Sequence, residues 1–441
     1  MKRLLSLLLC AVLALFCATT AQAAGVSITL TASEYALHYA FDAGAQDPFV
    51  ILEYATPAEK GWMMLYSADG HFEGDVSLAY SGAGGKTSVA LTSARTTGSI
   101  GKASTTLPKA ADYQKPTGKS NAKVTDFVLT ETPEGFHYAF NAIGTDYMLL
   151  YWRSKEQTVT QPVYPDENGH YEGDIISELT FARTQFTVQV KSGSGSMKKE
   201  ATVRKGYQAP GAPQRQEGRL SGVTVCIDAG HQENGRFVNE PIGPGLSGST
   251  SGKGGMAQGT KTNRRESIVC LEIGMLLRDE LLRQGANVIM TREDQTTFHT
   301  NIERCEIAEA GGAQIMLRLH CNNSSNHSKR GIQVYGPLNS DYAKAVADAD
   351  TYREMGQELL DAMKTRVGMT LANSTGMVRL NDNYVGNNWA KMMCFLVEMG
   401  YLSNPAEEYL LVTPVYQQWL AEGMADGVYE IAVARGWVQA Q

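Results

Sequence analysis

Cysteine is scarce and unevenly placed in this chain of 441 residues. Two of the seven cysteines, Cys10 and Cys17, lie close to the start, and none follows until Cys226. The sequence has no CxxC motif, and the five cysteines after residue 220 cannot all pair within the chain because their number is odd. We therefore expect no disulfide framework, and we expect Cys226, Cys270 and Cys394, which lie in apolar runs, to be small buried side chains.

Long apolar segments and runs of basic residues are also missing after residue 23. Residues 1–23 combine a basic start, an apolar run and the small-residue ending Ala21-Gln22-Ala23, which is the pattern of a secretory signal peptide cleaved after Ala23. The apolar run is short for a membrane span, which argues against a membrane anchor. Without Lys2 and Arg3 the formal net charge falls from -7 to -9, which excludes nucleic acid as a partner.

Two motifs in the first half of the chain recur at an interval of 99 residues. His38-Tyr39-Ala40-Phe41 returns as His137-Tyr138-Ala139-Phe140, and the six residues that start at Gly70 return, with one conservative change, at Gly169. Because both motifs keep the same interval, the pattern predicts tandem copies of one domain. We place the copies and the linkers that follow them at 24–108, 109–122, 123–207 and 208–220.

Each predicted copy has the pattern of β structure. Val26, Ile28 and Leu30 alternate with polar residues, and dipeptides such as Asp69-Gly70 favour tight hairpins. About 85 residues of short strands are typical of a β-sandwich. The linkers are rich in proline, glycine, glutamine and lysine, as spacers are.

The ligand of the two copies stays open at the level of sequence. Four histidines suggest a metal site, but their placement beside aromatic residues favours structural or surface roles: His38, His71, His137 and His170. Trp62 and Trp152 would stack on sugar rings if exposed, or fill the core if buried.

From Leu220 onward, short apolar runs alternate with segments of helical spacing. The runs predict strands over 223–227, 286–290, 315–319, 331–335 and 394–397. The spacing predicts helices over 267–284, 302–310, 342–365 and 415–434. This alternation favours an α/β catalytic domain over 221–441, with a mostly parallel sheet and helices on both faces.

Four polar residues lie where the active site of such a sheet forms. His231, His320 and Glu398 each follow an apolar strand, and Glu266 begins a helix after a polar loop. The carboxyl ends of parallel strands share one edge, so these side chains are expected to converge. Two histidines and one glutamate are a common catalytic zinc set. We predict His231, Glu266 and His320 as ligands of one Zn²⁺ and Glu398 as the group that accepts a proton from water.

Six sequence blocks in order give these residues a family resemblance. They are Val225 to His231, Arg265-Glu266, Thr291 to Asp294, Asn301 to Arg304, Arg318 to Asn322 and Leu396 to Asn404. Over residues 221–437 the chain resembles the zinc-dependent N-acetylmuramoyl-L-alanine amidases of bacterial cell walls. The resemblance implies a secreted or wall-associated bacterial hydrolase of peptidoglycan, with His231, Glu266 and His320 as ligands and Glu398 as the catalytic residue.

The chain departs from the family pattern around the expected cleft. Gln232-Glu233 replaces a glycine pair, Cys321 replaces a common alanine, and the glycine- and serine-rich loop 232–263 is long. Glu233 or Glu240 in this loop are further candidates to approach the metal. None of the departures removes a ligand.

Two rival functions remain compatible with the sequence. A carboxypeptidase-type zinc peptidase would use the same ligands on wall peptides, and a wall-binding protein would have weak or no catalysis. The predicted copies in the first half would bind either wall glycan or a protein partner.

Overall fold

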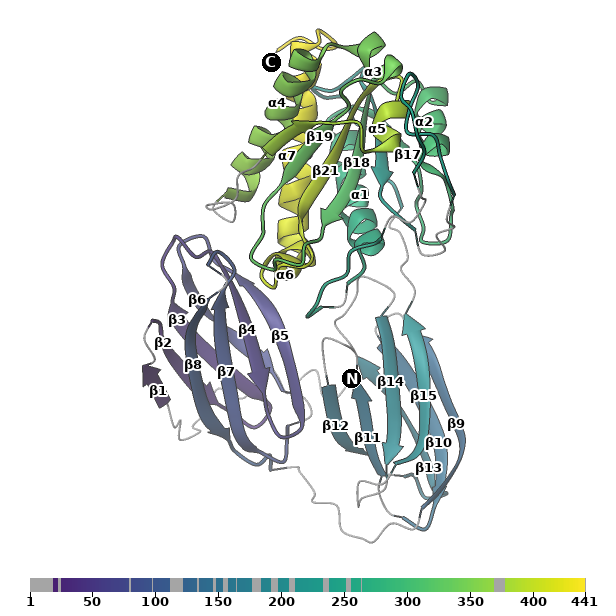
Figure 1. The fold of residues 1–441 in the computed structure, drawn as a ribbon. Coiled ribbons are helices and arrows are strands. Elements are labelled where there is room, and N and C mark those ends of the chain that lie inside the picture. Colours follow the sequence, from purple (N-terminus) through teal and green to yellow (C-terminus); the bar gives the residue numbers. More distant parts are fainter. Residues whose placement is uncertain are drawn as a thin grey trace. The chain divides into compact units, whose positions relative to one another are not determined.

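The computed structural model describes most of the chain (Figure 1). The described residues are 19–22, 25–78, 81–96, 98–111, 122–132, 135–145, 148–153, 158–163, 165–176, 184–191, 197–205, 211–232, 238–250, 255–262, 264–368 and 377–440. They form two compact units, and the chain passes from the N-terminal unit to the C-terminal unit near residue 205. Most of the predicted signal peptide lies outside the described residues.

The N-terminal unit is built of β-strands alone in its described part. The first eight strands are β1 (Thr19–Gln22), β2 (Ser27–Ala32), β3 (Ala36–Asp42), β4 (Phe49–Ala55), β5 (Glu59–Tyr66), β6 (His71–Ser77), β7 (Gly85–Ser93) and β8 (Ser99–Leu107). The next seven are β9 (Lys123–Thr132), β10 (Gly135–Ile143), β11 (Met148–Arg153), β12 (Thr158–Val163), β13 (His170–Ile176), β14 (Thr184–Lys191) and β15 (Met197–Lys205). Their sheets have the orders β1-β2-β3-β6, β13-β10-β9 and β15-β14-β11-β12-β5-β4-β7-β8.

The strand positions repeat the interval found in the sequence. Strands β3 and β10 begin at Ala36 and Gly135, and β6 and β13 begin at His71 and His170. Both pairs are 99 residues apart. Within the first set, the inward side chains of β2, β3 and β6 join those of β4, β7 and β8 in one apolar core. The division of this unit into two tandem domains stays a prediction.

Trp152 and the four histidines of the N-terminal unit have different environments. Trp152 is fully buried and packs edge to face on Phe136, with ring centroids 5.8 Å apart, so it cannot stack on a sugar. The four histidines lie on the outer face of β3, β6, β10 and β13, with side chains 32–51% exposed. They are surface residues, as the pattern favoured.

The C-terminal unit consists of one six-stranded sheet and its helices. Its strands are β16 (Thr224–Ala229), β17 (Asn287–Met290), β18 (Ile315–Asn322), β19 (Gln333–Gly336), β20 (Met377–Leu380) and β21 (Met393–Tyr401). Its helices are α1 (Glu266–Arg283), α2 (Asn301–Ala310), α3 (Asp341–Val346), α4 (Ala349–Val367), α5 (Val385–Trp389), α6 (Glu407–Leu411) and α7 (Pro414–Ala434).

The sheet of this unit is mixed, with the order β17-β16-β18-β21-β19-β20. The first four strands are parallel neighbours, whereas β19 runs antiparallel to β21, and β20 is parallel to β19. The strand predicted over 331–335 is therefore present, but it reverses direction. Apolar runs predict a strand without its direction, because a strand presents the same residues to the core whichever way it runs.

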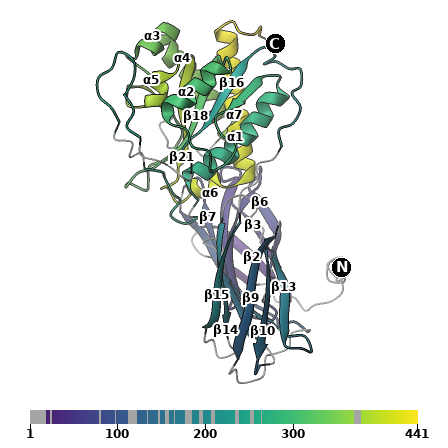
Figure 2. The same cartoon turned by 90° about the vertical axis from the view of Figure 1, so that its right-hand side faces the viewer.

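Helices flank the sheet of the C-terminal unit (Figures 1 and 2). Helix α7 packs against α1 and α4, and these last two lie on the strands, α1 on β16 to β18 and α4 on β19 and β20. Cys305 and Ala308 of α2 pack against Cys226 of β16 and Cys394 of β21. All five cysteines of the described residues are buried and unpaired, and burial was expected for three of them, Cys226, Cys270 and Cys394.

The helix expected over 342–365 is two helices. Ala347 has an extended backbone, with φ −164° and ψ 162°, and Asp348 then caps α4 by accepting a 2.8 Å hydrogen bond from the backbone N–H of Thr351. Such a cap satisfies an N–H that has no partner within the helix. In the described part of the chain, no helix has the length and apolar character needed to cross a membrane.

We predict that residues 211–441 fold without the rest of the chain. The segment before β16 already belongs to this unit, because Arg215 donates to the carbonyl of Gly285 at 3.0 Å and Gln216 to that of Leu282 at 3.0 Å. The fragment should show a cooperative thermal transition by circular dichroism, at a Tm close to that of the same unit in the full chain. A fragment without a cooperative transition would contradict the division.

Candidate metal centre

The four predicted site residues come together at one edge of the C-terminal sheet. His231 lies two residues after β16, and Glu266 is the first residue of α1. His320 and Glu398 face each other in the parallel ladder of β18 and β21. The backbone of His231 has φ 55°, a conformation that non-glycine residues rarely adopt. The turn after β16 therefore holds the backbone of His231 in a strained conformation.

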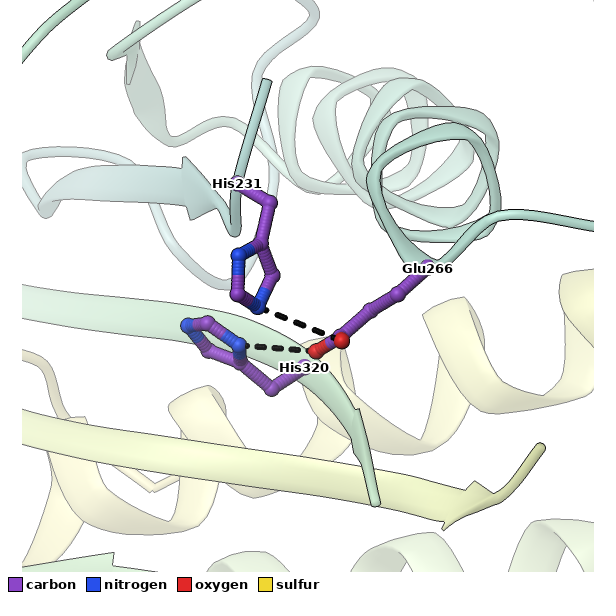
Figure 3. A group of neighbouring side chains, drawn as sticks. All are labelled: His231, Glu266 and His320. Carbon is purple, nitrogen blue, oxygen red and sulfur yellow. Dashed lines mark hydrogen bonds and ion pairs between the residues drawn. The ribbon is translucent and has the colours of Figure 1, made fainter. Parts of the chain in front are cut away.

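The carboxylate of Glu266 lies between the two imidazoles (Figure 3). Its Oε2 is 3.2 Å from Nε2 of His231, and its Oε1 is 2.9 Å from Nδ1 of His320. One donor atom from each of the three residues lies within 4.8 Å of the others, which holds for no other such trio among the described residues. Two imidazoles and one carboxylate at this spacing fit a divalent ion, since they are the donor set of many catalytic zinc centres.

The pKa shifts of Glu266 and His320 also suit a metal. Burial by itself would raise the pKa of Glu266, but hydrogen bonds from His231 and His320 outweigh it and hold the pKa well below its usual range. Glu266 also accepts hydrogen bonds from the backbone N–H groups of Ala257, at 2.7 Å, and Cys321, at 3.0 Å. Burial lowers the pKa of His320 against the opposing effect of Glu266. An ionised carboxylate and a neutral imidazole are the forms that bind metal.

Glu398 lies beside the trio in a different environment. Its Oε2 is buried and has no hydrogen-bond partner within the described residues. Burial, and next the charge of Glu266, raise the pKa of Glu398 to about 8. A carboxyl group without a structural partner and with a pKa near neutrality is suited to accept and release a proton.

Two arginines fix the turn that carries His231. Arg304 donates to the carbonyls of Ala229, at 2.9 Å, and His231, at 3.2 Å. Arg292 donates to the carbonyls of Ala229, at 2.8 Å, and Gly230, at 2.9 Å. A Cβ atom at Gly230 would lie 2.6 Å from the ring of His320, so the close approach of the two histidine segments requires glycine there.

Asp228 is the counter-charge of two buried arginines, Arg304 and Arg318. It is fully buried, forms an ion pair with Arg304, and accepts hydrogen bonds from Arg318 at 2.9 Å and from Thr291 at 2.7 Å. Burial would raise the pKa of Asp228, but the two arginines hold it far below the usual range. Asp228 and Arg292 were not predicted as parts of the site. The position of Asp228 at the end of an apolar strand could have indicated its role.

The site opens into a cavity of about 790 Å³. All four predicted residues line it, together with polar side chains that include Arg304, Arg318, Asn322 and Asn323. This volume is within the range of cavities that hold small ligands or parts of larger ones.

The carboxylate of Glu240, a further candidate to approach the metal, is bound at the start of α2. Its carboxylate accepts hydrogen bonds from the backbone N–H groups of Asn301, at 3.2 Å, and Ile302, at 2.8 Å, and from the Asn301 side chain, at 2.7 Å. These N–H groups begin α2, where a helix attracts negative charge, so Glu240 is bound at a helix end. Glu233 lies outside the described residues.

We predict that Asp228→Asn destabilises the protein by about 3–5 kcal/mol, the usual cost of removing one partner from a buried ion pair. The substitution would leave Arg304 and Arg318 buried without a counter-charge. Denaturant unfolding of the metal-free protein measures the change. Asp361→Asn, at an exposed position of α4, is the control and should change the free energy of unfolding little. An equal effect of both substitutions would contradict the role of Asp228.

The raised pKa of Glu398 predicts a pH dependence of stability in the metal-free protein. The folded state binds this proton more tightly than the unfolded chain, so stability falls as the pH rises from the ordinary carboxyl range to about 8. The Glu398→Gln variant has no ionisable group at this position, so its stability should lack the part of the decrease with pH that Glu398 causes. The measurement is the Tm in the presence of a chelator between about pH 5 and 9. The Glu293→Gln variant, at an exposed position, is the control. Parallel pH profiles for all three proteins would refute it.

Comparison with known proteins identifies the C-terminal unit. Residues 225–430 match the family model of N-acetylmuramoyl-L-alanine amidase. The germination-specific N-acetylmuramoyl-L-alanine amidase of Bacillus subtilis is 26% identical over 231 residues, which cover 49% of this chain and 83% of that protein. The probable cell wall amidase LytH of Staphylococcus aureus is 27% identical over 218 residues, which cover 48% of this chain and 60% of LytH.

Solved structures of two amidases also match. The N-acetylmuramoyl-L-alanine amidase from Clostridium difficile 630 is 24% identical with a TM-score of 0.38, covering 48% of this chain and 96% of its own. The corresponding enzyme from Mycobacterium smegmatis is 16% identical with a TM-score of 0.43, covering 49% and 99%. On the family match, the C-terminal unit belongs to the N-acetylmuramoyl-L-alanine amidase family, which hydrolyses amide bonds.

Proposed function

We propose that this chain is a secreted zinc amidase that cleaves the amide bond between N-acetylmuramic acid and L-alanine in peptidoglycan. The observation that carries the proposal is the convergence of His231, Glu266 and His320 beside the unpartnered carboxyl of Glu398. These residues line one cavity in a unit that belongs to the amidase family.

The donor set supports zinc as the metal. His231, Glu266 and His320 would hold one ion, and three protein ligands of these types are the set found at many catalytic zinc centres. Other divalent ions that accept imidazole ligands could replace zinc. When bound, such an ion supplies Lewis-acid chemistry, because it polarises a carbonyl and makes water more acidic.

Glu398 is suited to move the proton that amide hydrolysis requires. Its carboxylate would take the proton from the attacking water and give it to the leaving nitrogen. The cation held by the trio would lower the pKa of Glu398 from its value of about 8 toward neutrality, since an opposite charge favours the ionised form. In that range the group can both accept and donate.

The remaining residues of the site would fix the substrate and the ligands. Asn323 would offer hydrogen-bonding groups to the sugar or the stem peptide, from the segment that also carries His320. Arg292 and Arg304 hold the carbonyls around His231, so they act as positioning residues. A site of fixed geometry requires less reorganisation during the reaction.

The N-terminal unit is proposed to deliver this chemistry to the wall. We interpret residues 24–108 and 123–207 as tandem β-sandwich domains that bind wall glycan or a protein partner. Cleavage after Ala23 would remove β1, and the sheet β6-β3-β2 would then have three strands, like β13-β10-β9.

We predict that Glu398→Gln affects turnover first, whereas Glu266→Gln affects zinc binding first. Glu398→Gln keeps the shape of the side chain but cannot accept a proton, so turnover should fall about 100-fold or more while the zinc content stays equal to that of the unaltered protein. Glu266→Gln removes a ligand charge, so zinc should be lost first. The measurements are zinc content by mass spectrometry and turnover on purified peptidoglycan, for both variants and for His231→Ala and His320→Ala.

The products of the same reaction separate the proposal from its rivals. An amidase frees stem peptides with a new alanine amino end and leaves the glycan strands intact. A carboxypeptidase would release C-terminal amino acids, and a wall-binding protein would release nothing. If Glu398→Gln loses zinc while Glu266→Gln keeps it, the two roles are exchanged. If both variants keep zinc and turnover, the mechanism is refuted.

A further inference from the structure

The outer face of the N-terminal unit carries the same cluster of polar side chains twice. In the first copy, strands β3 and β6 place His38 opposite Asp75, Ala40 opposite Glu73, and Asp42 opposite His71. In the second copy, β10 and β13 place His137 opposite Asp174, Ala139 opposite Glu172, and Asn141 opposite His170. Each cluster therefore has two histidines with one glutamate between them.

In the first cluster both imidazoles direct the same nitrogen to the shared glutamate. Nε2 of His38 is 3.3 Å from the carboxylate of Glu73, and Nε2 of His71 is 3.8 Å from its other oxygen. The Nδ1 atoms lie on carboxylates of the facing strands, that of His38 at 3.1 Å from Asp75 and that of His71 at 2.6 Å from Asp42.

The second cluster has the same arrangement. Nε2 of His137 is 3.1 Å and Nε2 of His170 is 3.7 Å from the carboxylate of Glu172. Nδ1 of His137 lies 2.8 Å from Asp174, and Nδ1 of His170 lies 2.8 Å from Oδ1 of Asn141. The two copies thus share the atoms as well as the residue types.

We propose that each cluster is a surface binding site for a divalent metal ion, with ligands His38, His71 and Glu73 in the first copy and His137, His170 and Glu172 in the second. Metal-binding histidines usually donate their second ring N–H to a carboxylate or carbonyl, which fixes the ring and its tautomer. Here every Nδ1 has such an acceptor and every Nε2 faces the glutamate. Imidazole nitrogens favour ions such as Zn²⁺, Cu²⁺ and Ni²⁺.

The one change between the copies argues for ligand orientation and against simple charge pairing. Asp42 of the first cluster corresponds to the neutral Asn141 of the second. The amide N–H₂ of Asn141 donates to Asp126 at 3.0 Å, so its oxygen faces His170 and accepts from Nδ1. What both copies retain is a hydrogen-bond acceptor for Nδ1, which would hold the proton on that nitrogen when Nε2 binds a metal. Exposed ion pairs stabilise a protein little, so stability gives no comparable reason for the repetition.

The clusters use the ligand types of the catalytic trio in a more open geometry. At the catalytic centre the histidine nitrogens lie 2.9 and 3.2 Å from Glu266, and all three donor atoms are within 4.8 Å. In the described part of the chain, the ligand atoms of the surface clusters are not as close to one another as those of the catalytic trio. Their histidine side chains are 32–51% exposed, so they can move together around an ion, and water can complete its coordination. Binding should therefore be weaker than at the catalytic centre.

Counting bound zinc in the full chain tests the proposal. Calorimetric titration of the metal-free protein with Zn²⁺ should give three ions per chain, one tight and two weaker. With the catalytic ligands removed by His231→Ala and His320→Ala, two should remain. Adding His38→Ala and His71→Ala should leave one, and adding His137→Ala and His170→Ala should leave none.

Matched controls lie on the same faces of the sheets. Thr29→Ala on β2 and Thr130→Ala on β9 should leave the count unchanged, and circular dichroism should show every variant folded. Asp42→Asn should keep its site, because the second copy has asparagine there, whereas Asp42→Ala should weaken it. Cu²⁺ bound to the protein without catalytic ligands should show nitrogen hyperfine splitting in its electron paramagnetic resonance spectrum.

Two results would overturn the proposal. One is a count of one zinc ion per chain in the unaltered protein and none after the catalytic ligands are removed. The other is a count of surface-bound ions that the histidine substitutions leave unchanged, which would place the ions elsewhere. Neither result bears on the amidase, because its metal and its turnover are measured at a different centre.

Discussion

The buried carboxylate of Glu266 is the point on which the site depends. It is 3% exposed, and four groups donate to it or lie within ion-pair distance: two imidazoles and the N–H groups of Ala257 and Cys321. These groups come from a loop, a strand and the turn after another strand. A buried charge is tolerated only when it is paired and hydrogen-bonded, so the fold must keep all of these segments in place to keep Glu266 ionised.

A second group of buried charges, formed by Asp228, Arg304 and Arg318, stabilises the segment that carries His231. Asp228 allows Arg304 and Arg318 to be buried, and Arg304 with Arg292 then fixes the carbonyls of the turn at His231. The strained backbone of His231 is held in this way by contacts that do not involve the metal. The ligand geometry is consequently a property of the folded chain, and a metal would bind to a site that is already formed.

The sequence predicted which side chains come together better than it predicted their surroundings, for a physical reason. His231, Glu266 and His320 could be found because they follow strands or begin a helix, and the parallel strands of the sheet end at one edge. The reversal of β19 and the interruption at Ala347 could not be found, because apolar periodicity carries neither strand direction nor a local change of φ and ψ. The role of Glu240 as a hydrogen-bond acceptor could not be found either, because it depends on α2, which is distant in sequence.

The three clusters of two histidines and one glutamate place the same residue types in different surroundings. At Glu266 the trio is buried, lines a cavity, and has beside it the carboxyl of Glu398, whose pKa is raised to about 8. At Glu73 and Glu172 the same residue types lie on an open sheet face, and the carboxylates around them are occupied in orienting Nδ1 atoms. Hydrolysis needs a water-excluding site and a free proton acceptor in addition to a metal. The surface clusters have neither, so their ligand sets are suited to binding without catalysis.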